Sequence, residues 1–334
     1  MNKIALAVHG GAGTILKAEM TAELEIEYRN GLENALRKGR EVLLKNGTAL
    51  DAVESAVAEL ENFPLFNAGR GAVFTHEGKN ELDAAIMDGA NGKAGAVAFV
   101  KNVVNPIKLA RLVMERTEHI LLGGDGANEF AREMNVEFAP DDYFYTEHRY
   151  QQLLKAREAG KVQLDHAEKT EIRSRKSEDR NQKSEIGNRK SEIRNLKPIG
   201  TVGAVACDSM GNLAAATSTG GMTNKKFGRI GDTPIIGAGT FADNRTCAVS
   251  CTGHGEYFMK TLAAYDVSAL MKYKNLSLKD AAHEVVENLR KIGGEGGLIA
   301  VDALGNVALP FNSDGMYRGF VTADSALKTD IYGF

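Results

Sequence analysis

The residue best suited to nucleophilic chemistry is Thr201, which directly follows Gly200. Glycine tolerates strained backbone angles and has no Cβ to shield its carbonyl, so the peptide bond before Thr201 is open to attack. A charged segment poor in apolar residues, about 165–197, ends just before this bond. A threonine at the start of a strand is by itself usually an ordinary β-forming residue.

Three further hydroxyl side chains, Thr217, Ser218 and Thr219, follow on the next predicted strand. Together with the glycine and the charged segment, they favour a chemical role for Thr201 over a merely structural one. The sequence offers no persuasive Ser-His-Asp set, and we expect His9 to be a packed side chain.

Arg229 and Asp232 lie three residues apart and could recognise a zwitterion. An arginine can bind a carboxylate through two hydrogen bonds, and an aspartate can pair with an ammonium group. The alternative to substrate binding is a salt bridge between these two residues on the protein surface, and their spacing alone favours that alternative.

Helices that could position these residues are indicated by apolar spacing and capping residues. They are expected at 22–46, from the cap at Thr48 through Leu60, after Pro106 through Met114, at about 254–273 and at 278–292.

Short apolar runs predict strands. The run 4–8 is expected to be a buried strand that ends in a glycine turn at Gly10 and Gly11, and hairpins are expected around 88–92, 209–211 and 303–305. Strands that are apolar on both faces must be covered on both sides, so the predicted fold has sheets inside and helices outside.

The charged segment repeats Lys-Ser-Glu at 176–178, 183–185 and 190–192, a period of seven. A coiled coil would need apolar residues at two positions of each heptad, and few large apolar residues occur here. We therefore expect a solvated linker at about 165–197.

Composition excludes several classes of protein. The net charge of -3 gives no basic footprint for nucleic acid, and no apolar stretch is long enough for a membrane span. The N-terminal apolar run is too short for a signal peptide. Three cysteines without a CxxC pair indicate neither disulfides nor zinc, so we expect a cytoplasmic protein with buried thiols at Cys207, Cys247 and Cys251.

Over nearly its whole length outside the charged segment, the chain resembles the plant-type L-asparaginases and isoaspartyl aminopeptidases, which are N-terminal-nucleophile hydrolases. The resemblance rests on eight sequence blocks in the family's order: HGGAG at 9–13, PLFNAGRGAVFT at 64–75, ELDAAIMDG at 81–89, GTVGAVACD at 200–208, GNLAAATSTGGMTNK at 211–225, GRIGDTPIIGAGT at 228–240, CTGHGE at 251–256 and GGLIAVD at 296–302.

The resemblance implies an α+β fold, a four-layer αββα sandwich. It also implies self-cleavage between Gly200 and Thr201 into an α chain (1–200) and a β chain (201–334). The hydroxyl of Thr201 would then be the nucleophile. Its freed α-amino group, with a reference pKa of about 7.7–8.0, would act as the base, so no histidine is required. The two chains would form one folded domain and assemble as a dimer of αβ units. Thr219 would hydrogen-bond the nucleophile and orient it.

The resemblance also assigns oxyanion and substrate contacts. The Thr252 hydroxyl and the Gly253 N–H would stabilise the oxyanion, although Thr252 could instead cap the following helix. Arg229 and Asp232 would hold the substrate's charged groups. Gly253 and Gly255 would add backbone contacts, and Asn67, close to the site, would also bind substrate.

The family's structural sodium ion would be held by backbone carbonyls, and no cofactor is expected for catalysis. The matching carbonyls are those of Leu60, Glu61, Phe63, Phe66, Ala68 and Arg70.

The implied activity is hydrolysis of L-asparagine to L-aspartate and ammonia, together with cleavage of N-terminal isoaspartyl (β-aspartyl) dipeptides. Hydrolysis of N4-glycosylasparagine is an alternative, and an unprocessed, non-enzymatic binding module is an alternative of another class. The charged segment is longer than expected for the family, and His254 lies at a position that varies between members.

Overall fold

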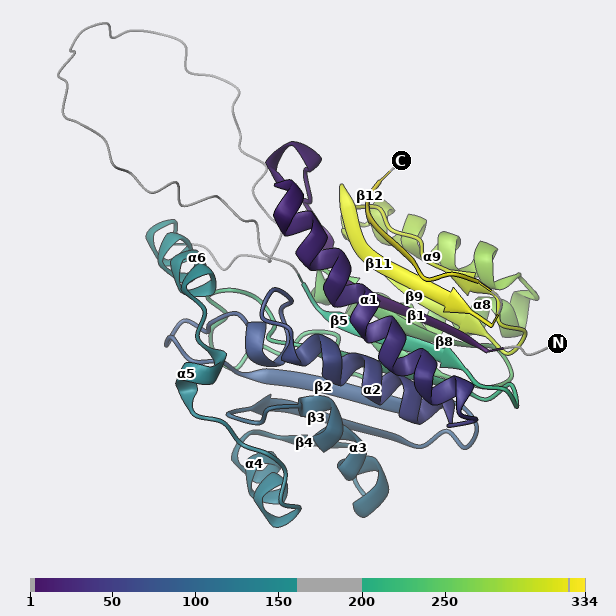
Figure 1. The fold of residues 1–334 in the computed structure, drawn as a ribbon, viewed down its shortest axis with the longest axis horizontal. Coiled ribbons are helices and arrows are strands. Elements are labelled where there is room, and N and C mark those ends of the chain that lie inside the picture. Colours follow the sequence, from purple (N-terminus) through teal and green to yellow (C-terminus); the bar gives the residue numbers. More distant parts are fainter. Residues whose placement is uncertain (1–3, 161–199, 324, 334) are drawn as a thin grey trace, which may run out of the picture.

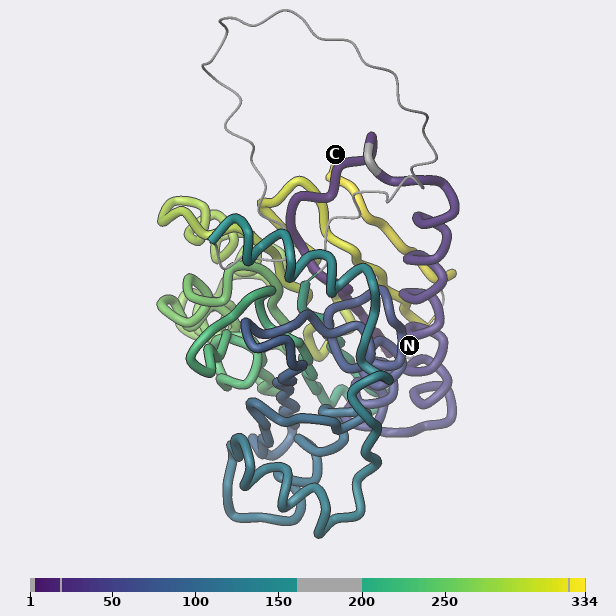
Figure 2. The backbone as a smooth tube through the Cα atoms, turned by 90° about the vertical axis from the view of Figure 1, so that its left-hand side faces the viewer, coloured from purple at the N-terminus to yellow at the C-terminus, as the bar shows by residue number. Residues whose placement is uncertain are grey.

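A computed structural model describes residues 4–160, 200–323 and 325–333. The segment predicted to be a linker, 165–197, lies outside the described residues. Two β-sheets form the centre of the described structure, and helices lie on both sides of them (Figures 1 and 2). The protein therefore has a mixed α+β fold.

The larger sheet has eight strands, and the only parallel neighbours among these described strands are β3 and β4. In spatial order the strands are β12 (Lys328–Tyr332), β11 (Gly315–Thr322), β1 (Ala5–Gly13), β5 (Val202–Cys207), β6 (Leu213–Thr219), β2 (Leu82–Asp88), β3 (Ala94–Val100) and β4 (Leu121–Gly123).

Within the described ranges the smaller sheet has four strands, ordered β10 (Val307–Ala308), β9 (Gly296–Asp302), β8 (Cys247–Gly253) and β7 (Thr240–Ala242). Its strands β8 and β9 contact β1 and β5 of the larger sheet. Small side chains such as Ala7, Ala215 and Ala248 fill the space between the sheets, which explains how the two backbones approach each other.

Helices cover the outer face of each sheet. α1 (Ala22–Leu44), α2 (Ala49–Asn62) and α3 (Pro106–Arg116) pack on the larger sheet, and α8 (Ala263–Lys274) and α9 (Leu278–Lys291) pack on the smaller one. In Figure 2 the purple helix α1 lies on one side of the molecule and the green helices lie on the other. The remaining helices are α4 (Gly124–Glu133), α5 (Asp141–Phe144), α6 (Glu147–Glu158) and α7 (Gly255–Thr261), with short 3-10 turns at Lys17–Glu19 and Gly69–Gly71.

The predicted caps are confirmed. The Thr48 side chain accepts a hydrogen bond from the Asp51 N–H (3.1 Å) at the start of α2, and Ser277 accepts one from the Asp280 N–H (3.2 Å) at the start of α9. Each cap satisfies one of the unpaired N–H groups that a helix start exposes.

Two expectations were wrong. The predicted helix 254–273 is interrupted at Leu262, whose φ of 50° is left-handed and ends α7 before α8 begins. The glycines of the first block form no turn after the strand; they lie within β1, which continues to Gly13 with an irregular pairing between His9 and Gly11.

The three cysteines are free and buried, as predicted. No helix in the described part of the chain is long and apolar enough to cross a membrane.

Strand alternation brings polar side chains into the space between the sheets. On β1, Leu6 and Val8 face the helices, whereas Ala5 and Ala7 face the smaller sheet. Residues two apart on a strand share a face. The same alternation directs these polar residues between the sheets: His9, Thr201, Thr217, Thr219, Ser250 and Thr252.

Candidate active site

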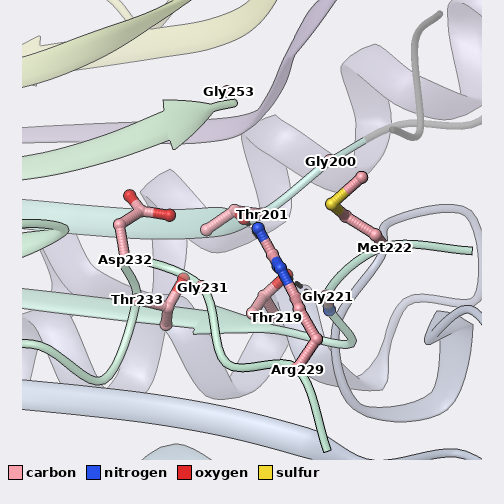
Figure 3. Close-up of a pocket in the computed structure, with 10 residues that line it drawn as sticks. All are labelled: Gly200, Thr201, Thr219, Gly221, Met222, Arg229, Gly231, Asp232, Thr233 and Gly253. Carbon is pink, nitrogen blue, oxygen red and sulfur yellow. Dashed lines mark hydrogen bonds between the residues drawn. The ribbon is translucent and has the colours of Figure 1, made fainter. Parts of the chain in front are cut away.

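A pocket lies where β5 begins and where β6 and β8 end. Figure 3 shows its lining residues: Gly200, Thr201, Thr219, Gly221, Met222, Arg229, Gly231, Asp232, Thr233 and Gly253. The pocket thus brings together the predicted nucleophile, its predicted partner Thr219 and the two predicted substrate-binding charges.

Thr201 and Thr219 are in contact. Val202 pairs with Ser218 in the antiparallel ladder, which places the preceding and following threonines side by side. The Thr201 hydroxyl donates a hydrogen bond to Thr219 Oγ1 (3.1 Å), and the Gly221 N–H donates to the same oxygen (3.0 Å). The Gly221 N–H in the turn after β6 therefore holds the Thr219 hydroxyl while this hydroxyl contacts the predicted nucleophile.

Arg229 is held by a partner that the sequence did not reveal. Its Nε donates to Glu256 Oε1 and its Nη2 donates to Glu256 Oε2, both at 2.9 Å. This bidentate pair fixes the plane of the guanidinium group at the pocket. Glu256 lies in the first turn of α7, where a helix start favours an acidic side chain.

Asp232 is buried, and its Oδ2 has no hydrogen-bond partner in the described structure. Burial raises the pKa of this carboxyl to about 6, against the lowering effect of the positive charge on Arg229. A buried acceptor without a partner is costly, so this oxygen is suited to bind a cationic group that enters the pocket.

Gly255 allows the two charged side chains to lie close to each other. A Cβ at this position would lie 2.7 Å from Asp232 Oδ1 and 2.9 Å from Arg229 Nη2. Any larger residue would displace at least one of the two side chains. The glycine is thus explained by packing around the pocket.

The helix-cap interpretation of Thr252 is wrong. Thr252 is a buried residue of β8, and its Oγ1 accepts the Ala12 N–H at 3.3 Å. The residue before α7 is His254, whose side chain makes no capping hydrogen bond. Gly253, which follows Thr252, lines the pocket with a φ of 148° that favours glycine.

Comparisons with known proteins place this chain in a family. The sequence model described as asparaginase matches residues 2–331. The chain belongs to this asparaginase family. It is 51% identical over 333 residues to the isoaspartyl peptidase of Salmonella typhimurium, with 99% of each chain covered. It is 54% identical over 334 residues to the putative isoaspartyl peptidase/L-asparaginase of Dictyostelium discoideum (98% and 96% covered), and 41% identical over 331 residues to the isoaspartyl peptidase/L-asparaginase of Xenopus laevis (99% and 96% covered).

Asn67, which the family resemblance placed near the site, stabilises the backbone behind the pocket. Its Nδ2 donates to the Gly221 carbonyl (2.8 Å), and its Oδ1 accepts the Val73 N–H (3.0 Å). Asn67 is fully buried, so these contacts fix the turn that follows Thr219. A direct contact of Asn67 with substrate stays a prediction.

The loop for which the resemblance implies a sodium ion packs closely against its own backbone carbonyls. Gly69 has a φ of +49°, and a Cβ there would lie 2.5 Å from the Glu61 carbonyl oxygen. Four of the carbonyls in question accept one backbone N–H each, those of Leu60, Phe63, Phe66 and Ala68. A carbonyl oxygen has a second lone pair, and oxygen ligands suit hard cations, so the donor set is compatible with sodium.

Other residues at this asparaginase-type site were missed. Met222, Gly231 and Thr233 line the pocket, and Glu256 holds Arg229. Glu256 was part of a recognised block, but its partner lies 27 positions earlier in the chain. Only the fold reveals that pair.

Proposed function

We propose that this chain is a self-processing amidohydrolase that hydrolyses L-asparagine to L-aspartate and ammonia and cleaves N-terminal isoaspartyl dipeptides. The contact between Thr201 and Thr219, in one pocket with Arg229 and Asp232, carries this proposal. Relatives along the whole chain are named isoaspartyl peptidases or isoaspartyl peptidase/L-asparaginases, which supports the substrate class.

Maturation breaks the peptide bond between Gly200 and Thr201, giving chains 1–200 and 201–334. Thr201 then carries a free α-amino group next to its own hydroxyl. This amine has a reference pKa of about 7.7–8.0 and takes the hydroxyl proton as the oxygen attacks the side-chain carbonyl of the substrate. Thr219, which contacts the Thr201 hydroxyl at 3.1 Å, keeps that oxygen aimed at the pocket.

The attack places negative charge on the substrate's carbonyl oxygen. The Thr252 hydroxyl and the Gly253 N–H donate to this oxyanion. Thr252 Oγ1 accepts from the Ala12 N–H, which leaves the hydroxyl proton to be donated. When this intermediate collapses, the C–N bond breaks, and the protonated Thr201 amine gives its proton to the leaving nitrogen, which departs as ammonia or an amino acid and leaves an ester on Thr201. Water then attacks the ester and gives a proton to the same amine, which passes it to Thr201 Oγ1 as the C–O bond breaks, so aspartate is released and Thr201 is restored.

Both substrates have a free α-carboxylate and α-ammonium group at one end. Arg229 binds the carboxylate and Asp232 binds the ammonium group, which supplies the partner that Asp232 Oδ2 lacks. Backbone groups of Gly253 and Gly255 add contacts. The leaving group, ammonia or an amino acid, lies beyond the reacting carbonyl and is not held by these residues.

The same proposal covers architecture and assembly. The layers form the four-layer αββα sandwich of N-terminal-nucleophile hydrolases, and two αβ units form a dimer. A structural sodium ion is bound by the carbonyls of the loop that carries Asn67, and it would hold that loop in place. The free, buried cysteines fit a reducing compartment such as the cytoplasm.

Thr201→Ala tests the proposal. We expect intact mass spectrometry to find one uncut chain and ammonia release from asparagine to be abolished, because nucleophile and cleavage site are the same residue. Thr246→Ala is the control, since Thr246 is also buried and its hydroxyl contacts Ser268 away from the pocket (2.6 Å). An alanine variant at 201 that still splits in two would overturn the mechanism.

A further inference from the structure

His9 is fully buried between the sheets and contacts the residue proposed as nucleophile. Its Nδ1 lies 2.9 Å from the Thr201 carbonyl oxygen, and its Nε2 lies 2.8 Å from Ser250 Oγ. Neither Ser250 nor the carbonyl group of Thr201 takes part in the chemistry proposed above, so these contacts need a separate explanation.

The hydrogen positions on His9 follow from its partners. Burial lowers the pKa of His9 to about 3, so the ring is neutral at any pH at which the protein would work. The Thr201 carbonyl can only accept, so Nδ1 carries the ring proton. The other nitrogen, Nε2, must then accept, and the Ser250 hydroxyl donates to it.

The same logic extends through two more hydroxyls. Because Ser250 uses its proton on His9, its oxygen accepts from Thr217, 2.7 Å away. Thr217 Oγ1 accepts in turn from the Thr240 hydroxyl at 2.7 Å. The other carbonyl acceptors available to Thr217 and Thr240 are more distant, at 3.3 Å and 3.2 Å. The result is a chain of hydrogen bonds in which each group donates to the next, from Thr240 through Thr217, Ser250 and His9 to the Thr201 carbonyl.

This chain of hydrogen bonds ends at Thr201, just beyond the regular ladder. The pairing between β1 and β5 stops at the pair of His9 with Gly203, two residues short of Thr201. The His9 ring therefore supplies a hydrogen bond to the Thr201 carbonyl beyond the last ladder pair. Gly203 makes this possible, because a Cβ there would collide with Ser250 Oγ and His9 Nε2.

We propose that the chain of His9, Ser250, Thr217 and Thr240 is a positioning device that fixes the backbone of Thr201 from four strands. This inference rests on the proposed role of Thr201 as nucleophile. Cleavage of the bond before Thr201 turns it into a chain end, and chain ends lose order unless they are held. The His9 hydrogen bond to the carbonyl and the Thr219 contact to the hydroxyl together fix the residue at two points, so its amine and oxygen keep the geometry that catalysis needs.

Two substitutions at Thr217 separate this role from simple packing. Thr217→Val keeps the side-chain shape and removes the hydroxyl, whereas Thr217→Ser removes a methyl group and keeps the hydroxyl. We expect Val to lower kcat for asparagine by about tenfold with KM changed less than about twofold, and Ser to stay within about twofold of the parent in both, because misplaced reacting groups chiefly slow the chemical step. Rates are normalised to the fraction of chains cleaved, measured by intact mass.

A packing role predicts the opposite order, because Val would then be tolerated better than Ser. A Val variant with an unchanged kcat would overturn the inference and leave the proposed function intact. Failure of the proposed function is recognised separately, since the unmodified protein would then release no ammonia or Thr201→Ala would keep its activity.

Ser250→Ala with Ser268→Ala as its matched control provides a second test. Both serines are buried and each contacts a threonine hydroxyl, at 2.7 Å and 2.6 Å. We expect a fall in kcat only for the variant at 250. Nitrogen NMR of the ring, assigned with His9→Gln, should show a proton on Nδ1 and none on Nε2 from pH 5 to 9; an Nε2-protonated ring would break the chain and refute the inference.

Discussion

Arg229 and Asp232 lie close together at the pocket but do not pair with each other, which suits the binding of a zwitterion. Glu256 takes two hydrogen bonds from Arg229, which leaves Asp232 Oδ2 without a partner in the described structure. If Arg229 had paired with Asp232 instead, the two charges would largely cancel each other. Glu256 therefore keeps the carboxylate of Asp232 available for an ammonium group.

The raised pKa of Asp232 makes ligand binding dependent on pH. Burial brings this pKa to about 6, so the carboxyl loses its charge as the pH falls through that value. We expect the product L-aspartate to inhibit about tenfold more weakly at pH 5 than at pH 7, since only the ionised carboxyl attracts the α-ammonium group. Inhibition constants at the two pH values test this. Asp232→Asn should bind weakly at both, and a constant value for the unmodified protein would contradict the assignment.

Arg229→Ala should raise KM for asparagine by an amount equivalent to about 2–4 kcal/mol of binding, because it removes the partner of a desolvated carboxylate. Steady-state kinetics on fully cleaved protein measure this. Arg245→Ala is the matched control, since Arg245 also pairs with an acidic residue, Asp243 (2.6 Å), but has 73% of its side chain exposed. Equal KM values for the two variants would show that Arg229 does not contribute to substrate binding.

At the scale of helices and strands, local chemistry was predictable and long-range pairing was not. The caps at Thr48 and Ser277 and the hairpin of β5 and β6 follow from signals a few residues apart. Strands β11 and β12 were not predicted, and β11 pairs with β1 from the other end of the sequence. The sequence singled out the hydroxyls of Thr201 and Thr219 by type and order along the chain, and Thr252 only through the family resemblance. The pairing of His9 with Ser250 depends on which strands face each other.

The break between α7 and α8 at Leu262 is a local feature that could not be predicted. Nothing in the apolar pattern of the sequence around Leu262 indicates that the helix ends there. A leucine with a φ of 50° carries a strain of about 1–2 kcal/mol that glycine avoids. We expect Leu262→Gly to stabilise the protein by roughly 0.5–1 kcal/mol, because the relief of strain exceeds the cost of glycine's greater unfolded-state entropy and of the lost side-chain contacts. Thermal unfolding measures this change. Leu304→Gly is the control at an exposed leucine without a positive φ, and an equal effect at both sites would contradict the strain argument.

At the scale of the whole molecule, the proposed cut does not divide the fold into two separate parts. Residues before the cut supply β1, β2, β3 and β4, and residues after it supply the other strands. In the larger sheet β1 lies between β11 and β5, and β6 lies beside β2. Strands from the two sides of the cut therefore alternate across a single sheet, and the core between the sheets includes side chains from both.

This alternation predicts how the mature protein should behave. We expect the two chains to co-elute in native size-exclusion chromatography, to separate only in denaturant and to unfold in one transition. Separating them would break the ladders of β1 with β11 and β5 and of β6 with β2, and would expose the shared core. The uncut Thr201→Ala protein is the comparison, and its calorimetric transition should also be single. Release of either chain in native buffer would show that the ladders across the cut contribute little, because no covalent bond between the chains remains after cleavage.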